Sequence, residues 1–484
     1  MSGLTAGHRH RSAPDTERVA ISRESGLPVR LRASRGPSRS SVSRAQIASW
    51  VTKQSGDSHC PLPQVGTLPG LGTAASVRCE HDAAMTSSTS EQSAPKRVLV
   101  TGGAGEMGAY ACGVLAKADE IAKVVVADRD EEKATKLAAD LGPKATPLAL
   151  DISDSEALAR ALADVDIVLN CAGPFYRFGR EVLSAAIAAG TDYLDICDDW
   201  EPTLEMLELD DAARAAGVTA VIGMGASPGT SNLLAVLAMD ECDAVDRVYT
   251  SWRASAAHFP RPTADQEFPE ATAAIEHWVH NCTEPIKIWR DGGLVDAHAL
   301  EELTLAYPGW GEDAVWVCGH PEPLTLPRIR PEVRESLNVM SARRGLMNGI
   351  SGIAERVRAG ELNVRQASDE LLRQPNLSGK AAGRSPSLPS NIFAIAEGTK
   401  DGTRVRVGAQ ALVQPEGNMG EMTGIPLAVA TLMAARGQVS KPGVHGPEGA
   451  IDPKIFFNDL AQFADEPPAP GVAVYEVVTD VLDS

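Results

Sequence analysis

Three glycines between residues 103 and 108 have the spacing needed to bind a nucleotide pyrophosphate. They lie in the order G-A-G-E-M-G, after the β-rich run K-R-V-L-V-T and before a helix-forming segment. The first permits a tight turn, the second lets main-chain amides approach the anion, and the third lets helix and strand pack closely. The N-terminus of the helix faces the same anion. The predicted cofactor contacts are Gly103, Ala104, Gly105, Glu106, Met107 and Gly108.

An acidic residue follows at the position where dinucleotide-binding proteins hold the adenosine ribose. Asp128 ends the second predicted strand, and its carboxylate can accept hydrogen bonds from the ribose hydroxyls. This carboxylate favours NAD because it would repel a 2′-phosphate, yet the neighbouring Arg129 could pair with that phosphate. The sequence therefore predicts NAD or NADP without choosing between them.

Two later segments lie where further cofactor contacts are expected. Asp151 and Ile152 follow the third strand and would lie beside the adenine, although Asp151 could equally belong to a helix cap. Asn170, Ala172, Gly173 and Pro174 follow the fourth strand, at the carboxyl edge where such sheets bind ligands. Their small side chains would let the main chain approach the dinucleotide.

Candidates for proton transfer cluster where the fifth strand leaves the sheet. Asp198 and Tyr193 are the first choices, and Asp195, Cys197 and Asp199 share the location. A partly desolvated carboxylate facing the nicotinamide could exchange a proton with an amine or alcohol. The same carboxylates could instead cap the helix that begins near Pro202. His277 and His280 lack a third ligand, so we expect no metal.

The elements that must position these residues alternate between strand and helix from residue 96 to about 222. This alternation predicts an α/β fold with a doubly wound parallel Rossmann sheet. After residue 240 the pattern changes, and a hairpin over 392–397 and 404–412 predicts an inserted α+β domain. The predicted parts are a disordered extension (1–95), a Rossmann domain (96–235), an α+β substrate or dimerisation domain (236–418), C-terminal helices returning to the Rossmann domain (419–465) and a tail (466–484).

The composition of the chain limits the classes of partner that it is expected to bind. The chain of 484 residues has a net charge of −19, which disfavours nucleic acid and anionic membranes, and it has no apolar run of bilayer-spanning length. Eight scattered cysteines suggest reduced thiols, so we expect a cytoplasmic protein with a small-molecule substrate and no membrane partner. Residues 1–84 are basic and rich in Arg, Ser, Pro and Gly, which predicts disorder. We hypothesise that translation starts at Met85.

A short-chain dehydrogenase would share the glycine turn but needs a tyrosine with a lysine four residues later, and none of the six tyrosines has one. Instead, the combination of V-L-V-T-G-G-A-G-E-M-G, N-C-A-G-P-F, D-Y-L-D, G-A-S-P-G-T-S-N and T-G-I-P-L-A resembles the saccharopine dehydrogenase-like family over roughly residues 96–460. The resemblance implies an NAD(P)-dependent oxidoreductase that acts on a C–N bond of an amino-acid-like substrate, between a Rossmann domain and an inserted α+β domain. A homodimer is a possible assembly.

The sequence departs from that family in the loop that would face the substrate. Saccharopine-type enzymes usually have Asp-Pro-Gly there, with a further Asp and His, and this chain has Ser227, Ser231 and Asn232 at those positions. Serine and asparagine cannot offset the burial of a cation, and the loop could also be simply a helix start. The departure leaves a second hypothesis, a non-catalytic NAD(P)-binding sensor or scaffold. The expected substrate contacts are Cys197, Ser227, Pro228, Gly229, Ser231 and Asn232.

Overall fold

The structure is a computed structural model that describes residues 94–254, 273–373, 388–389, 392–415 and 417–482. All of these belong to one compact unit, Ser76–Ser484. The expected disorder of the N-terminal extension and the hypothesis about Met85 concern residues that lie outside the described ones. The side chain of His277 also lies outside the described part of the chain. No helix among the described residues is long and apolar enough to cross a bilayer.

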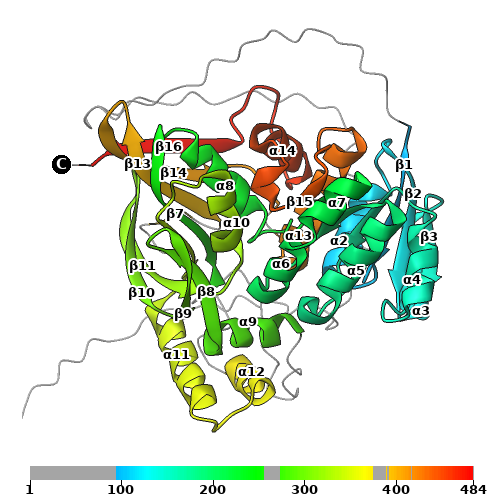
Figure 1. The fold of residues 1–484 in the computed structure, drawn as a ribbon, viewed down its shortest axis with the longest axis horizontal. Helices are drawn as coiled ribbons and strands as arrows, with labels where there is room; N and C mark the ends of the chain where they lie inside the picture. Colours follow the sequence, from blue (N-terminus) through cyan, green and yellow to red (C-terminus); the bar gives the residue numbers. More distant parts are fainter. Residues whose placement is uncertain (1–93, 255–272, 374–387, 390–391, 416, 483–484) are drawn as a thin grey trace, which may run out of the picture. The chain divides into compact units, whose positions relative to one another are not determined.

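Residues 96–221, together with β15 from the C-terminal part of the chain, form a seven-stranded parallel sheet in the order β15-β6-β5-β4-β1-β2-β3 (Figure 1). Its strands are β1 (Lys96–Thr101), β2 (Ile121–Asp128), β3 (Ala145–Ala149), β4 (Ile167–Asn170), β5 (Asp192–Asp195), β6 (Thr219–Val221) and β15 (Gly443–His445). The order reverses between β1 and β4, and such switch points hold the ligand in open α/β sheets. The predicted doubly wound Rossmann sheet is therefore confirmed.

Helices cover both faces of this sheet because its strands are apolar on both sides. One face carries α2 (Glu106–Leu115), α3 (Glu131–Leu141), α13 (Met419–Ala435) and α14 (Pro453–Leu460). The other face carries α4 (Ser155–Leu162), α5 (Phe175–Ala189), α6 (Trp200–Leu207) and α7 (Asp210–Ala216).

The rest of the chain forms a nine-stranded mixed sheet, which confirms the expected α+β second domain. Its main path runs β10-β11-β12-β7-β13-β14-β16, and β8 joins β12 to β9. The strands are β7 (Ala244–Arg253), β8 (Pro285–Arg290), β9 (Gly293–His298), β10 (Glu302–Tyr307), β11 (Gly311–Cys318), β12 (Glu335–Ser341), β13 (Phe393–Lys400), β14 (Thr403–Ala411) and β16 (Tyr475–Val481).

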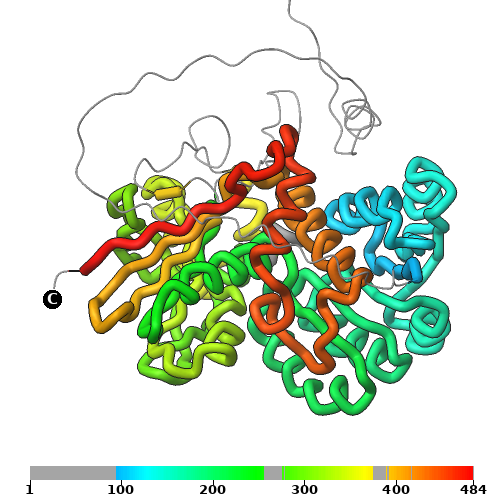
Figure 2. The backbone as a smooth tube through the Cα atoms, turned by 90° about the horizontal axis from the view of Figure 1, so that it is seen from above, coloured from blue at the N-terminus to red at the C-terminus, as the bar shows by residue number. Residues whose placement is uncertain are grey.

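The expected hairpin is present as β13 and β14. Their register closes at the pair Lys400 and Thr403, so the turn consists of Asp401 and Gly402 alone. Both have positive φ, at 50° and 75°, which is the backbone that an Asp-Gly hairpin turn requires. Residues 475–481, which we expected in a tail, form β16 and pair with β14 (Figure 2). Pairing with the edge of the sheet satisfies the main-chain hydrogen-bonding groups of this short segment, which it could not satisfy by itself.

The remaining elements of the described chain are five helices and two short 3₁₀ turns, of which η3 (Ala461–Phe463) directly follows α14. Helices α9 (Ala273–Thr283), α11 (Arg344–Arg358) and α12 (Val364–Arg373) pack over β11 and β12, while α8 (Thr230–Met239) and α10 (Glu322–Ile329) lie between the two sheets (Figure 1). A short 3₁₀ turn, η2 (Pro447–Gly449), contacts both α8 and α10. One apolar core runs from β1 and β2 through α8 to β13 and β14. The two sheets therefore share a core and pack as one body.

Helix α13 returns the C-terminal part of the chain to the nucleotide-binding half. It is apolar on all sides and buried over most of its length, as expected for a helix inside a core. Its glycines allow close contact with α2, because a Cβ on Gly424 would lie 2.3 Å from the carbonyl oxygen of Met107. On Gly420 it would lie 2.5 Å from Cγ of Glu106. The start of α13 is thereby held against the glycine turn.

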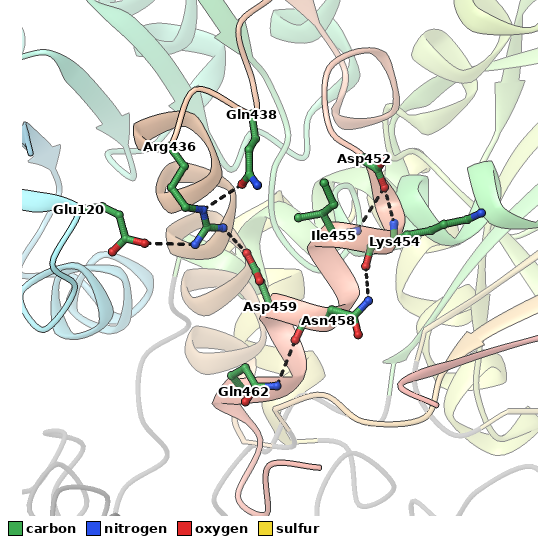
Figure 3. A network of polar contacts seen from close by, with 9 residues as sticks. All are labelled: Glu120, Arg436, Gln438, Asp452, Lys454, Ile455, Asn458, Asp459 and Gln462. Atoms are coloured by element: carbon green, nitrogen blue, oxygen red, sulfur yellow. Dashed lines mark hydrogen bonds and ion pairs between the residues drawn. The ribbon is translucent and has the colours of Figure 1, made fainter. Parts of the chain in front are cut away.

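A polar network fixes the other end of α13 (Figure 3). The guanidinium of Arg436 donates to Glu120 before β2 (3.2 Å), to Gln438 (2.9 Å) and to Asp459 on α14. Its side chain is about one third exposed, so water only partly screens these pairs. One arginine thus joins three segments that are far apart in the sequence.

We expect Arg436→Leu to lower the free energy of unfolding by about 1–2 kcal/mol, because it leaves two carboxylates without their common partner. Denaturant unfolding followed by circular dichroism measures the change. Arg334→Leu is the control, since the ion pair of that exposed arginine with Asp291 is 4.0 Å long and should contribute little. Equal losses in the two variants would contradict the role assigned to Arg436.

Candidate active site between the two sheets

The glycine turn has the geometry of a pyrophosphate cradle. The amide of Gly103 donates to the carbonyl of Ala127 (2.9 Å), and α2 begins directly after Gly105. A Cβ on Gly108 would lie 2.4 Å from the carbonyl oxygen of Gly102, so the third glycine is needed for close packing. Gly102 itself has φ 64° and lies against the main chain after β4, where a Cβ would meet Cys171 at 2.7 Å. The sequence pattern did not reveal this requirement.

The predicted ribose carboxylate lies beside the turn. Asp128 accepts hydrogen bonds from the amides of Ala104 (3.3 Å) and Asp130 (3.0 Å). This places a carboxylate at the carboxyl end of β2, next to the amides that are expected to bind the pyrophosphate. Adenosine should therefore extend over β2 and β3, and the nicotinamide half over β4, β5 and β6.

Asp151 is exposed and is not the cap of α4. Its carboxylate accepts from the amide and the hydroxyl of Ser153, at 2.9 and 2.7 Å, which lowers its pKa. The charges of Arg129 and Arg177 lower this pKa further, so two exposed arginines lie within electrostatic reach of it. The α4 cap is Asp154. The adenosine end of the site thus combines carboxylates with cations that could pair with a 2′-phosphate.

A buried chain of polar side chains crosses the carboxyl edge of the sheet. Thr101 on β1 donates to Oδ1 of Asn170 on β4 (2.8 Å), and Nδ2 of Asn170 donates to the hydroxyl of Tyr193 on β5 (3.2 Å). That hydroxyl donates to Oδ2 of Asp195 (2.8 Å). All four residues are buried. Tyr193 is therefore engaged in a structural network, and the catalytic role expected for it would require this network to open.

Asp195 carries the network onward to the turn after β6. Its Oδ1 accepts from the amides of Gly223 (2.6 Å) and Cys197 (3.0 Å), and its carbonyl accepts from Met224 (2.7 Å). Burial raises the pKa of this carboxyl to about 6, although the hydrogen bonds oppose the shift. The direction of the loop over 223–229 is thus set by one carboxylate.

The remaining proton-transfer candidates lie on the segment between β5 and α6 and differ in how deeply they are buried. Asp198 is half-buried, which leaves it as the most accessible of them. Asp199 is buried at the N-cap of α6. Cys197 is also buried, with Sγ next to the hydroxyl of Thr203 (3.7 Å), and burial raises the pKa of its thiol. A ligand reaches Asp198 more readily than Cys197.

The loop over 225–229 turns tightly into α8. The amide of Gly225 donates to the carbonyl of Pro228 (2.9 Å), and Gly229 donates to Oδ1 of Asn232 (2.9 Å). Gly229 has φ 119°, and a Cβ there would lie 2.2 Å from the Gly225 carbonyl oxygen. Gly225 in turn touches Thr423 of α13. The loop is therefore both a helix start and a neighbour of the segment that lies against the glycine turn.

The serines of this loop bind a carboxylate from the second domain. Ser227 and Ser231 donate to Oε1 of Glu322, at 2.5 and 2.7 Å, and Asn338 of β12 donates to the same oxygen (2.8 Å). Glu322 is fully buried at the start of α10, and burial raises its pKa to about 7. Nδ1 of His320 lies 3.3 Å from the Ser227 hydroxyl.

A second buried carboxyl group, that of Glu448, also binds the start of α8. Asn232 donates to Oε2 of Glu448 in η2 (2.8 Å), and burial raises the pKa of this carboxyl as well. The sequence led us to expect a loop without carboxylate charge, and its own residues indeed carry none. Glu322 and Glu448 supply that charge from positions 95 and 216 residues further along the chain.

Sequence reasoning missed Glu322, His320, Asn338 and Glu448. They lie outside every recognised pattern, and no local spacing connects them with the loop. Together they make a composite site. The glycine turn is the expected nucleotide cradle, the second domain supplies His320, Glu322 and Asn338, and the turn after β15 of the Rossmann sheet supplies Glu448. Such a site could hold the nicotinamide beside a small polar substrate. Within the described part of the chain, no three His, Cys, Asp or Glu side chains are grouped as metal ligands would be.

We expect Gly105→Arg to abolish NADPH binding, because the side chain would fill the space that the pyrophosphate needs. A Cβ at this position meets one neighbouring atom, at 3.0 Å, so the fold should survive. The control is Gly113→Ala on the same helix, where a Cβ meets nothing within 4 Å. Fluorescence titration with NADPH measures both, and unchanged affinity in Gly105→Arg would rule out the cradle.

Asp195 predicts a pH dependence of stability. Its pKa is about 6 in the folded protein and 3.8 in its unperturbed state, so the folded state binds the proton more tightly. The stability contributed by this group therefore increases as the pH falls from above 6 towards 4. Between pH 6.5 and 5, wild type should gain about 1 kcal/mol relative to Asp195→Asn. Urea unfolding at both pH values tests this, with the exposed Glu312→Gln as control. Parallel pH profiles for wild type and Asp195→Asn would refute it.

Comparison with known proteins agrees with this architecture. Residues 98–221 match the family model of the saccharopine dehydrogenase NADP binding domain. A saccharopine dehydrogenase [NADP(+), L-glutamate-forming] of Pyricularia oryzae is 31% identical over 196 residues, which are 38% of this chain and 40% of the relative. A trans-acting enoyl reductase of Mycobacterium leprae is 25% identical over 142 residues, 28% of this chain and 34% of the relative.

The fold also matches that of a solved structure. Apo saccharopine dehydrogenase (L-Glu forming) from Saccharomyces cerevisiae aligns with a TM-score of 0.54 and 20% identity, over 80% of this chain and 100% of that one. The sequence alignments span less than half the length of the curated relatives. The matched domain is an NADP-binding one, in agreement with the expected NAD or NADP cofactor. The resemblance seen in the sequence is thereby confirmed at the level of the nucleotide-binding domain: residues 98–221 match the saccharopine dehydrogenase NADP binding domain, and the chain shares its fold with a solved saccharopine dehydrogenase.

Proposed function

We propose that this protein is an NAD(P)-dependent oxidoreductase that transfers hydride at a C–N bond of an amino-acid-like or related small molecule. The observation that carries the proposal is the meeting of the loop over 225–232 with Glu322 on the nicotinamide side of the glycine turn. Nicotinamide supplies or accepts the hydride. The residues of the chain bind the dinucleotide, orient the substrate and move the proton.

The cofactor contacts retain the assignment made from sequence. The turn from Gly103 to Gly108 would hold the pyrophosphate through main-chain amides, and Asp128 the adenosine ribose. The segment from Asn170 to Pro174 would lie along the dinucleotide, since it packs against Gly102. Arg129 would contribute where the cofactor carries a 2′-phosphate.

Asp198 is our candidate for proton transfer. It follows β5 on the nicotinamide side, and it is less buried than Tyr193, Asp195 or Cys197. A carboxylate there could accept the proton released when an amine is oxidised to an imine, and return it in the reverse direction. The substrate would contact Ser227 and the neighbouring residues of its loop.

The non-catalytic sensor remains the second candidate. It is favoured by the internal hydrogen bonds of Ser227, Ser231 and Asn232, which are already engaged by Glu322 and Glu448. In that role the Rossmann domain would report the NAD(P) state to a partner. The homodimer and the cytoplasmic location expected from sequence remain predictions for either function.

Turnover separates the two candidates. We expect NADPH or NADH to be oxidised in the presence of a keto acid or aldehyde together with an amine, and we expect Asp198→Asn to lower kcat about 10²-fold or more while leaving nucleotide affinity unchanged. Absorbance of the reduced nicotinamide follows the reaction. The control is Asp164→Asn, on the surface before β4.

Two results would contradict this proposal. Nucleotide binding without turnover of any amine, imine or keto acid would favour the sensor. Turnover of an enoyl compound alone would show that hydride goes to a C=C bond, as the name of the mycobacterial relatives indicates for those proteins.

A further inference from the structure

The carboxyl group of Glu322 has one oxygen with hydrogen-bond partners in the fold and one oxygen without any among the described residues. Oε1 accepts three hydrogen bonds, from Ser227, Ser231 and Asn338, all of 2.8 Å or less. Oε2 is buried and has no hydrogen-bond partner among the described residues. An ionised oxygen left in this state costs several times the value of an ordinary hydrogen bond, so a native structure rarely leaves one without a function.

The three hydrogen-bond donors favour one protonation state of the Glu322 carboxyl group. Each of them presents a hydrogen to Oε1, and donors stabilise the ionised form. Burial and the like charge of Glu448 act in the opposite direction. The site therefore provides hydrogen bonds for the first oxygen of this carboxyl group and leaves the negative charge of its ionised form unbalanced. A donor that also carries positive charge would satisfy Oε2 and offset both the burial and the like charge.

The surroundings of Glu322 suit a nitrogen cation. The ring of His320 stacks in parallel on Trp252, with centroids 5.2 Å apart, and Trp252 donates to Asn338 (3.1 Å). Aromatic faces beside a carboxylate are a common environment for cationic nitrogen. Glu322 itself is fully buried, whereas Ser227 and Trp252 in the surrounding layer of side chains are partly exposed.

We propose that Glu322 is the specificity residue of this enzyme, and that its free oxygen Oε2 accepts a hydrogen bond from a positively charged nitrogen of the substrate. The substrate class is then amines, amino acids and protonated imines, and neutral hydroxyl or carbonyl analogues are discriminated against. This inference rests on the proposed function in one respect, namely that the ligand of Glu322 is the substrate. It assigns to Glu322 the charge that the loop over 225–232 lacks.

The test compares matched ligand pairs on the full-length protein loaded with NADPH. The probes are a panel of L-amino acids, among them lysine, glutamate and norleucine, each paired with its 2-hydroxy acid, which replaces the ammonium by a hydroxyl. Calorimetry or saturation-transfer NMR gives the affinities. For at least one pair, wild type should bind the amine at least tenfold more tightly, and Glu322→Gln should lose that preference with less than a twofold change for the hydroxy acid.

Two further variants keep the result interpretable. Glu322→Asp retains the charge but withdraws it by one methylene, and should weaken amine binding less than Glu322→Gln does. Glu397→Gln is the matched control, because Glu397 on β13 is a buried carboxylate of the second domain that is already paired with Arg406 (2.7 Å). Glu397→Gln should leave the affinities for the amine and for the hydroxy acid unchanged.

The outcomes distinguish this inference from the proposed function. Amine preference that depends on Glu322 in a protein without turnover would support the inference and count against the redox function. Turnover of amines that Glu322→Gln leaves unchanged would overturn the inference alone. No amine binding by wild type, or equal binding of both members of every pair, would overturn it as well.

Discussion

The carboxylate of Asp195 is the interaction on which the candidate site depends. It lies at the carboxyl end of β5, buried, and it holds two main-chain amides that would otherwise have no partner in the core. One of these amides belongs to Gly223, so the carboxylate determines how the chain leaves β6. Because the loop over 225–232 follows directly, the position of Ser227 is a consequence of a hydrogen bond made inside the Rossmann sheet. Tyr193 and Asn170 extend the same constraint to β4 and β1.

A second constraint acts between the sheets. Helix α8 begins in this loop and belongs to the apolar core that includes both the Rossmann strands and the β13–β14 hairpin. Helix α13 brings residues from the far end of the sequence against the glycine turn, with glycines at the points of closest approach. Both halves of the composite site are therefore positioned by the same packed interior, and a catalytic geometry of this kind needs such rigid support.

The site has an unusual distribution of charge. Two glutamates are buried beside the loop that begins α8, and burial raises the pKa of each. Serine and asparagine side chains of the loop donate to both of them. The loop thus binds carboxyl groups that other elements supply. In the saccharopine-type pattern, by contrast, the loop itself carries charged residues. Carboxyl groups are therefore present at this loop, although its own residues carry none.

The sequence by itself determined the Rossmann half. Its strands and helices are strongly periodic, and each glycine of the turn has a local steric reason, so G-A-G-E-M-G and Asp128 could be placed without knowledge of distant contacts. The Asp401-Gly402 hairpin was predictable for the same reason.

Only the tertiary structure decided the rest. It showed that Tyr193 and Cys197 face a core, that residues 475–481 complete a sheet, and that Glu322 meets Ser227 across 95 residues of chain. A buried hydrogen bond between such distant residues leaves no spacing in the sequence, because its geometry is set by the packing of whole elements and not by the local backbone.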